Sequence, residues 1–324
     1  MDKNNIRNFC VAPMMGYTTP HSRYFFRQMS KKAFLFTEMV ASKALLYSYK
    51  QKILLQKNKD ENPVAFQIGG SDPKELSKCA KIVEKNGFDE INLNVGCPSK
   101  AVLKGRFGAC LMKEKDLVKN CLIQMQNNTS IPVTIKCRIG VDNDDNYSFF
   151  RDFIGEILDS NISIIYIHAR KALLNGFSPK YNRNVPTLKY DYVYRIKKEF
   201  PNATFILNGG IDNIDKALNL KKDFDGIMVG RLIQSNPFIL KEIDNRFYNK
   251  KNSFEKKLII KNYFKYIRKN INNDSIYRLC SPLLNIFFGI PNSKKIKITI
   301  NQYMLEKKID KLENIFNNFA LYSN

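Results

Sequence analysis

A single cysteine follows a short alternating segment in the first third of the chain. In residues 90–98, EINLNVGCP, apolar and polar side chains alternate as they do in a β-strand, and a glycine and a proline flank Cys97 where the alternation stops. A thiol held at the tip of a strand is a candidate for acid–base or nucleophilic chemistry. The alternative is that Cys97 only fills space, because free cysteine is among the most buried residue types. This segment alone does not decide between the two.

Polar side chains close the other short apolar segments as well. They include Thr37, Glu38, Gln67, Asn94, Lys136, Arg138, His168 and Arg170. The last two segments end in Asn208, Gly209 and Gly210, and in Gly230 and Arg231. Glycines let backbone N–H groups approach a ligand closely, and an arginine adds positive charge, so these two turns together predict a phosphate site. The alternative is that the glycines serve only tight turns.

A phosphate site surrounded by these residue types fits flavin mononucleotide (FMN). Gln67 and Lys136 can bind the polar edge of a flavin ring, where a lysine stabilises the negative charge that reduction leaves. An apolar turn, formed by Pro13, Met14 and Met15, offers the ring a surface. His168 has an alternative role as a core histidine whose hydrogen bonds are satisfied.

The elements that position these residues form a repeating pattern. We expect strands at residues 10–12, 35–38, 64–68, 90–93, 133–136, 164–168, 205–208 and 226–229. Helical patterns lie between them. In residues 71–87, for example, Asp72 can cap a helix and Gly87 can close it. Eight βα units in a row predict an α/β fold, a (β/α)8 TIM barrel, in which polar strand ends meet at one mouth.

The charge of the chain points to a polyanionic partner. The sequence holds 53 Lys and Arg against 30 Asp and Glu, a formal charge of +23. Such an excess attracts nucleic acid, although a solvated basic surface without a partner is the alternative. Residues 241–324 are the most basic part, with 17 Lys and Arg against 7 Asp and Glu.

The pattern changes to helices after residue 240. An amphipathic helix is expected around residues 254–271, with an apolar face formed by Phe254, Leu258, Phe264, Ile267 and Ile271 and a basic face formed by Lys257, Lys261, Lys265 and Arg268. A closing helix is expected near residues 305–319. We predict a catalytic barrel in residues 1–240 and a helical RNA-binding domain in residues 245–324, with Tyr263 and Tyr266 interleaved among the cations.

Composition also argues against several classes of protein. Seven cysteines without a CxxC spacing, and only two histidines, argue against a disulfide framework, a zinc site and any other metal centre. No apolar run approaches the length of a membrane span, and the first residues lack an apolar signal core. We therefore expect a cytoplasmic protein that has no membrane partner. We also expect a monomer.

Long ordered stretches of the chain resemble the tRNA-dihydrouridine synthases, and within them the DusA branch. The stretches are APMMGYTTPHSRYFFRQ, LFTEMV, PVAFQIGGSDP, FDEINLNVGCPSKAVLKGRFGACLM, IPVTIKCRIGVDN, IHARKALLNGFSPKYNR, NGGI and DGIMVGR. The resemblance implies an FMN enzyme that uses NADPH to reduce uridine in the D-loop of tRNA, at positions 20 and 20a. It also implies that the base leaves its stack, that hydride passes to C6, and that Cys97 donates the proton to C5.

The same resemblance implies a role for each matching residue. FMN would be held by Pro13, Met14, Met15, Gln67, Lys136, His168, Asn208, Gly209, Gly210, Gly230 and Arg231. Asn94 would touch the target nucleotide, and Lys180, Arg183, Lys294 and Lys297 would orient the tRNA. The chain departs from the branch in two places. Its first turn reads MMGYTTPHSR where a Leu-Asp-Trp version is common, and its two C-terminal RNA positions are Lys where Arg is usual, which predicts a weaker grip on phosphate.

Two other functions remain open from the sequence. One is an FMN barrel oxidoreductase acting on a free pyrimidine, similar to a dihydroorotate dehydrogenase, which would leave the basic C-terminal part without a use. The other is a non-catalytic RNA-binding protein. The second is disfavoured because the expected proton donor and flavin-binding residues are all present, namely Gln67, Cys97, Lys136, His168 and Arg231.

Overall fold

The computed structural model describes residues 5–174, 176–251, 255–287 and 293–322. Within these ranges the strands form one parallel sheet in the order β1-β9-β8-β7-β6-β5-β4-β2, with the short β3 also paired to β4. The strands are β1 Phe9–Val11, β2 Leu35–Phe36, β3 Val40–Ala41, β4 Val64–Gly69, β5 Glu90–Val95, β6 Val133–Arg138, β7 Ile164–His168, β8 Thr204–Asn208 and β9 Gly226–Val229. A bridge from Cys10 to Phe34, just before β2, brings the two edges together, so the sheet closes into the predicted barrel.

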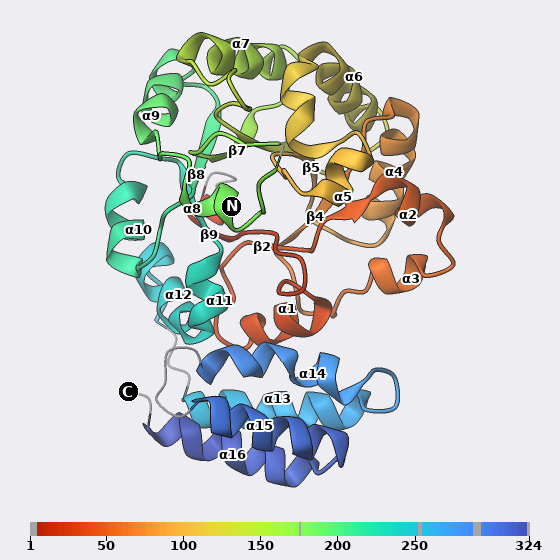
Figure 1. Ribbon diagram of the computed structural model, residues 1–324, viewed down its shortest axis with the longest axis vertical. Coiled ribbons are helices and arrows are strands. Elements are labelled where there is room, and N and C mark those ends of the chain that lie inside the picture. Colours follow the sequence, from red (N-terminus) through yellow and green to blue (C-terminus); the bar gives the residue numbers. More distant parts are fainter. Residues whose placement is uncertain (1–4, 175, 252–254, 288–292, 323–324) are drawn as a thin grey trace.

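The helices surround the barrel and then continue as a bundle below it (Figure 1). Those of the barrel are α1 Pro20–Arg27, α2 Ser42–Tyr47, α3 Gln51–Leu54, α4 Pro73–Lys85, α5 Lys100–Lys104, α6 Lys115–Gln126, α7 Tyr147–Leu158, α8 Tyr181–Asn184, α9 Tyr190–Glu199, α10 Ile214–Lys221, α11 Arg231–Ser235 and α12 Leu240–Tyr248. The bundle consists of α13 Lys256–Asn270, α14 Ile276–Leu284, α15 Ser293–Leu305 and α16 Ile309–Tyr322. In the described part of the chain four 3₁₀ turns precede or connect these elements: η1 Asn5–Arg7, η2 Gly108–Lys113, η3 Pro237–Ile239 and η4 Asn285–Phe287.

The structure has a strand at each of the eight predicted positions, but the predicted length of the second strand is wrong. The sequence predicts one strand over residues 35–38, whereas the chain forms β2 and then β3, separated by three residues. The side chain of Thr37 explains the break. Its hydroxyl accepts a hydrogen bond from the backbone N–H of Gln67 at 3.0 Å and donates to the carbonyl of Glu38 at 2.8 Å. A hydroxyl thus takes the place of a backbone carbonyl and interrupts the ladder.

Helix α4 follows the sequence pattern closely. The carboxylate of Asp72 accepts from the backbone N–H of Glu75 at 2.8 Å, as an N-cap does, and Pro73 occupies the first position. Leu76 lies on the buried face with three other side chains of the helix. Gly87, just beyond the end, has a φ of +72°, which is the left-handed conformation typical of a helix terminator.

Apolar side chains pack in two separate places because strand residues alternate between the two faces of the sheet. The outer face packs against the helices, for example through Phe9, Phe66 and Phe205. The inner face forms a small cluster inside the barrel, which consists of Cys10, Ala12, Phe34, Phe36, Ala65, Tyr166, Ile206 and Met228. These residues come from β1, β4, β7, β8, β9 and the segment around β2, so the apolar cluster fills one side of the interior.

The C-terminal bundle packs against α1, and Figure 1 shows α14 directly beneath that helix. The ring of Tyr24 on α1 stacks on the ring of Tyr266 at a centroid distance of 4.0 Å. His21 on α1 bonds to the Tyr266 hydroxyl at 2.8 Å and to a carboxylate oxygen of Asp274 at 2.9 Å. This junction of aromatic and polar contacts sets the position of the bundle relative to the barrel.

Two expectations for the bundle are wrong. Tyr263 is fully buried and Tyr266 is 8% exposed, so neither ring is available to stack on RNA; both pack between α1 and α13. Leu258, predicted on the apolar face, is 51% exposed, and Ile259 and Ile260 are buried in its place. A helix whose apolar residues cover a wide arc leaves its edge residues ambiguous in sequence. The predicted positions Phe254 and Phe319 lie outside the side chains that the structure describes.

The predicted basic face of α13 is exposed, as expected. Lys257, Lys261 and Lys265 all point to solvent. Arg268 is also exposed, but it donates to Asp310 at 2.6 Å and to Glu313 at 2.7 Å on α16. Its charge therefore joins two helices of the bundle, whereas no ion pair is seen for the three lysines among the residues that the structure describes.

Candidate active site

The turn that carries Cys97 is held by the side chain of Asn94. The carboxamide oxygen of Asn94 accepts from the backbone N–H of Gly96 at 3.1 Å and from that of Cys97 at 3.0 Å. The thiol itself is half-buried at the carboxyl end of β5, and its sulfur lies 3.5 Å from the hydroxyl of Ser99. The carbonyl of Cys97 also accepts from Ala109 at 3.0 Å. A thiol on a turn fixed at this many points has a defined direction.

Gln67 lies on β4 beside Asn94 and is buried. Its carboxamide oxygen accepts from Asn94 at 2.9 Å, and its amide nitrogen donates to Asn92 at 2.9 Å. The predicted flavin-binding and nucleotide-binding residues are thus in direct contact with each other. Each amide has spare hydrogen-bonding capacity for a ligand, since a carboxamide offers two donors and two acceptor positions.

Lys136 projects from β6 into the barrel mouth. Its ammonium donates to the side-chain oxygen of Asn208 on β8 at 3.1 Å. Burial, together with the neighbouring charge of Arg138, lowers the pKa of Lys136 to about 8. Asn208 in turn donates to the carbonyl of Met228 at 2.8 Å. The amine is therefore a desolvated group whose hydrogen-bond partner is a neutral amide, so no carboxylate among the described residues neutralises the charge with which it could stabilise developing negative charge.

His168 occupies the end of β7 next to the glycine turn. Burial lowers the pKa of His168 well below its usual value, and the charges of Arg138, Lys136, Arg170 and Arg231 act in the same direction. The imidazole is consequently neutral near pH 7. It is 9% exposed and is the last residue of β7, so it lies at the carboxyl end of that strand, where the barrel mouth is.

The two predicted phosphate turns have the backbone that the sequence requires. Gly209 and Gly210 have φ values of +111° and +65°, and a Cβ at Gly209 would come within 2.5 Å of the His168 ring. Only glycine fits there without displacing that ring. The carbonyl of Gly209 accepts from the hydroxyl of Tyr190 at 2.6 Å. The turn is thus both close to the mouth and rigid.

Gly230 and Arg231 begin α11 at the end of β9. The Arg231 side chain is exposed, and its guanidinium donates to the side-chain oxygen of Asn184 and to the backbone carbonyl of Arg183 at 3.3 Å. A Cβ at Gly230 would contact the sulfur of Met14 at 3.3 Å. The structure therefore brings the first turn and the last strand end together, as barrel closure requires.

The first turn presents its apolar side chains to the mouth. Pro13 and Met14 are half-buried, and Met15 is 65% exposed. Thr18 closes the turn, because its hydroxyl accepts from the backbone N–H of Met14 at 3.0 Å. The carboxylate of Glu38 accepts from the N–H of Gly16 at 2.7 Å, which joins this turn to the next strand end.

Lys180 and Arg183, predicted to orient tRNA, lie on and just before the short helix α8, and both are exposed. The buried Asn182 anchors this loop: its side-chain oxygen accepts from the N–H of Leu173 at 2.7 Å and its amide donates to the Leu173 carbonyl at 2.9 Å. Lys294 and Lys297 lie on α15 of the bundle, the first exposed and the second half-buried. The loop and the bundle are separate elements, so they offer two distinct contacts to a large ligand.

Several residues of the mouth are absent from the sequence prediction. Arg138 was noted as a strand end but was not assigned to the site, although its guanidinium donates to the Gly96 carbonyl beside Cys97 at 2.9 Å. Asn92 and Thr134 were not assigned at all. Their positions in the sequence could have identified them, because each lies two residues before an assigned residue on the same strand, and side chains two apart share a face of the sheet.

The buried Arg170 also follows a strand end. It is 9% exposed, and its Nε has no hydrogen-bond partner.

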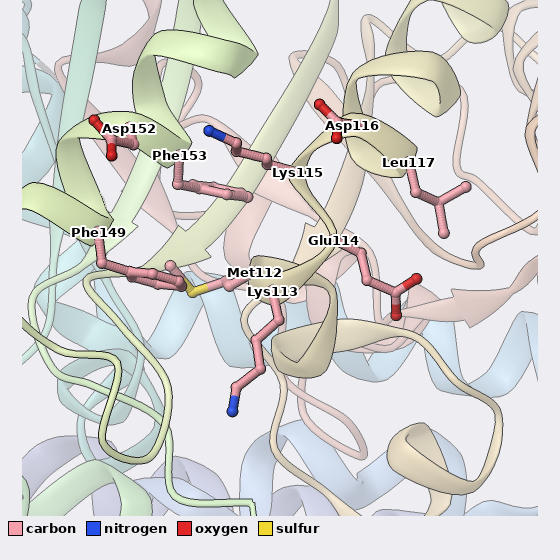
Figure 2. A pocket seen from close by; sticks show the side chains of 9 residues that line it. All are labelled: Met112, Lys113, Glu114, Lys115, Asp116, Leu117, Phe149, Asp152 and Phe153. Atoms are coloured by element: carbon pink, nitrogen blue, oxygen red, sulfur yellow. The ribbon is translucent and has the colours of Figure 1, made fainter.

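A surface hollow of about 480 Å³ lies away from these residues, between η2, the start of α6 and α7 (Figure 2). Figure 2 shows the lining side chains, among them the rings of Phe149 and Phe153 and the charged groups of the lysines and acidic residues. Two lysines and three acidic side chains line it. No predicted site residue is among its lining residues, and its balance of charges is slightly negative. The hollow is therefore separate from the candidate active site at the barrel mouth.

The described part of the chain has no group of three or more His, Cys, Asp or Glu side chains arranged to hold a metal ion. Among the same residues, no helix combines the length and apolar character needed to cross a lipid bilayer.

The fold and the mouth define a TIM-barrel enzyme with a thiol beside a cluster of cations. An old yellow enzyme homologue from Zymomonas mobilis has the same fold, with a TM-score of 0.54 over 76% of this chain and 90% of that one at 11% identity. The family model for dihydrouridine synthase matches residues 10–320. The chain therefore belongs to the dihydrouridine synthase family, whose members are flavin-dependent oxidoreductases.

Curated relatives from distant bacteria agree with this assignment. The chain is 41% identical to a tRNA-dihydrouridine(20/20a) synthase of Shewanella oneidensis, over 90% of this chain and 87% of that protein. It is 46% identical to the protein of the same name from Haemophilus ducreyi, over 82% of this chain and 81% of that protein. The identity to the protein of that name from Synechocystis sp. is 40%, over 93% of this chain and 91% of that protein. Family membership sets aside the two alternatives, a dihydroorotate dehydrogenase-like enzyme and a non-catalytic RNA-binding protein.

Proposed function

We propose that this protein reduces uridine to 5,6-dihydrouridine at positions 20 and 20a of the tRNA D-loop, with FMN as its flavin and NADPH as the reductant. The observation that carries the proposal is the position of Cys97. Its thiol is half-buried at a barrel mouth that also holds the neutral His168 and the desolvated amine of Lys136. The names of the curated relatives support the positions in tRNA.

The residues of the mouth fit FMN. The left-handed turn of Gly209 and Gly210, which a Cβ would fill, and the exposed guanidinium of Arg231 suit a phosphate. Gln67 and Lys136 suit the polar edge of the ring, and the turn at Pro13, Met14 and Met15 offers an apolar surface beside it. His168, Asn208 and Gly230 complete the set. When bound, FMN supplies the hydride that adds to C6 of the uracil.

The protein's own chemical step is a proton transfer. Reduction of the C5=C6 double bond needs a hydride at one carbon and a proton at the other, and Cys97 provides the proton to C5 from its sulfur. Asn94 holds the turn of Cys97 and lies where it can contact the target base. The guanidinium of Arg138 donates to the carbonyl of Gly96, next to Cys97. Its positive charge therefore lies close to the thiolate that the proton transfer leaves.

Binding of tRNA uses two separate regions of the chain. Lys180 and Arg183 lie on the loop at the mouth, and Lys294 and Lys297 lie on α15 in the helical bundle, which we propose as the tRNA-binding domain. A base inside a folded tRNA is out of reach of a barrel mouth, so the uridine must leave its stack. Contacts at two places hold the rest of the tRNA while the base enters the barrel.

The proposal is tested with purified protein, FMN, NADPH and unmodified tRNA transcripts. Dihydrouridine is measured by mass spectrometry of nuclease fragments. Transcripts in which uridine 20, uridine 20a or both are replaced by cytidine locate the reaction, and free uridine serves as the control substrate. We expect product at both positions and none from free uridine. Product at another D-loop position, or from free uridine alone, would contradict the proposal.

A further inference from the structure

One wall of the barrel interior is polar, although the inside of a TIM barrel is normally filled by bulky apolar side chains. We define the interior chain as the five inward-facing residues Glu90, Thr134, Asn92, Gln67 and Asn94. They come from the three adjacent strands β4, β5 and β6. Their exposed fractions lie between 0% and 8%. A buried polar row of this length needs a partner at every step, because a buried polar group without a hydrogen bond is destabilising.

The interior chain begins at an ion pair deep in the barrel. The carboxylate of Glu90 accepts from the guanidinium Nε of Arg7 at 2.9 Å, and the Tyr166 hydroxyl donates to the same oxygen at 3.3 Å. Its other oxygen accepts from the Thr134 hydroxyl at 2.6 Å. Because an ionised carboxylate can only accept, the proton of the Thr134 hydroxyl must point toward Glu90.

From Thr134 the chain continues toward the mouth through three carboxamides. Asn92 donates to the Thr134 oxygen at 2.8 Å, Gln67 donates to the Asn92 oxygen at 2.9 Å, and Asn94 donates to the Gln67 oxygen at 2.9 Å. The strand register places these residues side by side, since Gln67 is opposite Asn92 and Asn92 is opposite Thr134. No flexible segment separates one step from the next.

The chain ends on the catalytic turn. The oxygen of Asn94 accepts from the backbone N–H groups of Gly96 and Cys97. The groups at the two ends require the same donor-to-acceptor direction along the row. The carboxylate at one end can only accept hydrogen bonds, and the two backbone N–H groups at the other end can only donate them. Reversing the three carboxamides would place an amide nitrogen against the N–H groups of the turn and leave the Thr134 oxygen without its donor. Only one orientation therefore satisfies the whole row.

We propose that Glu90, Thr134 and Asn92 are positioning residues for the reaction. They touch neither flavin nor substrate, but they set which face of the Gln67 carboxamide points to the cofactor and where the turn of Cys97 stands. The proposal rests on the proposed function for its activity readout. Its second readout, the protection of the turn, does not depend on any activity. An ion pair near the amino ends of the strands thus acts on a thiol at the carboxyl ends through four further hydrogen-bonded side chains.

The test variant is Thr134→Val, which keeps the shape of the side chain and removes its hydroxyl. Thr134→Ser restores the hydroxyl, and Thr204→Val, at the start of β8 and outside the interior chain, is the matched control. We measure two rates on flavin-loaded protein: reduction of the flavin by NADPH, and reoxidation of the reduced flavin by tRNA. We also measure hydrogen exchange at the amides of Gly96 and Cys97.

In Thr134→Val we expect reoxidation by tRNA to slow by roughly ten- to a hundredfold, the range for a misplaced reacting group, while flavin reduction by NADPH changes much less. Exchange at the two amides should rise. Thr134→Ser and Thr204→Val should match the wild type in all three measurements. If Thr134→Val exchanges its amides and reoxidises its flavin as the wild type does, the proposal is wrong. It is also wrong if flavin reduction and flavin reoxidation slow by the same factor and the melting temperature falls, because that result indicates a general loss of stability. If tRNA fails as an oxidant even for the wild type, the proposed function fails, and the exchange result still decides the inference.

Discussion

The guanidinium of Arg138 donates from Nε to the carbonyl of Gly96 at 2.9 Å, one residue before Cys97. Its NH1 group donates to the carbonyls of Lys171 at 2.8 Å and Asn182 at 3.0 Å. One buried side chain therefore joins the turn of Cys97 to the loop that carries the predicted tRNA contacts. The three acceptors are backbone carbonyls, so they constrain the paths of two loops and not merely the rotamers of side chains.

Replacing Arg138 by lysine keeps the charge and removes the fork that reaches three carbonyls. We expect Arg138→Lys to lower kcat/KM for tRNA by roughly ten- to a hundredfold, because both loops lose their common anchor. Steady-state kinetics with a fixed NADPH concentration measures this. Arg195→Lys, an exposed position on α9, is the control and should match the wild type. A full-rate Arg138→Lys enzyme would show that the two loops hold their positions independently.

Cys97→Ala tests the proton donor. The variant should bind FMN as the wild type does, because the thiol belongs to the substrate side of the mouth, and it should lose about 10²- to 10⁴-fold in dihydrouridine formation, the usual contribution of a general acid. Flavin absorbance gives the first quantity and mass spectrometry of tRNA the second. Cys110→Ala is the matched control, since Cys110 is also half-buried and lies on η2. Normal turnover in Cys97→Ala would remove the role assigned to the thiol.

Arg231→Ala tests the phosphate turn. Its guanidinium is exposed at the end of β9, where we propose that it balances the FMN phosphate, so its loss should weaken FMN binding by at least about tenfold, as charged hydrogen bonds of this kind contribute roughly 1.5–3 kcal/mol. Flavin retained after gel filtration is the measurement. Arg195→Ala serves as the control. Equal flavin content in the two variants would place the phosphate elsewhere.

The fold was predictable because its main signal is periodic. Eight apolar segments with helical patterns between them specify a barrel, and the glycine turns at Gly209 and Gly230 lie at strand ends as expected. The extent of the second strand was not predictable, because it depends on the Thr37 hydroxyl bonding to Gln67, a residue thirty positions away. A side chain that replaces a ladder carbonyl leaves no periodic trace in the sequence.

The polar wall inside the barrel was missed for a different reason. In β5, the alternation of Asn92 and Asn94 with Ile91 and Leu93 predicts a strand, but it does not say which side is inside. The usual assumption places polar residues toward water. Here Ile91 and Leu93 pack against the helices, and the asparagines face the barrel interior. Only the partners that three strands bring together make that arrangement stable.

The burial of the two tyrosines has a similar explanation. Tyr263 and Tyr266 alternate with lysines, a pattern that predicts RNA stacking from α13 alone. Their rings are buried because α1, more than two hundred residues earlier, packs on the same face through Tyr24. Contacts between segments so distant in sequence are invisible to a local pattern.

The junction between α1 and the bundle predicts a pH-dependent stability. Burial lowers the pKa of His21 below its usual 6.5, so the folded protein takes up a proton at this site less readily than the unfolded chain. The stability that neutral His21 contributes is therefore fully present above the pKa of His21 in the unfolded chain. It is lost as the pH falls through the pKa of His21 in the folded protein. Urea unfolding at pH 7.5 and 5.5 should show a larger loss for the wild type than for His21→Gln. His168 also has a lowered pKa, but it is present in both proteins and cancels in the comparison. Equal losses would contradict the assignment to His21.

The final prediction concerns the salt dependence of tRNA binding. Lys294 is exposed and Lys297 half-buried on α15, and each is proposed to neutralise a phosphate of the tRNA. Removing a phosphate contact lowers the slope of log K against log salt by about 0.7–0.9 per contact. The double variant Lys294→Ala, Lys297→Ala should therefore bind tRNA more weakly and lose roughly 1.4–1.8 from that slope. A matched pair, Lys81→Ala with Lys85→Ala on the exposed face of α4, removes the same charge from the barrel side. If the two pairs change the slope equally, the effect comes from the net charge of the protein; a change confined to the α15 pair identifies direct contacts to the tRNA.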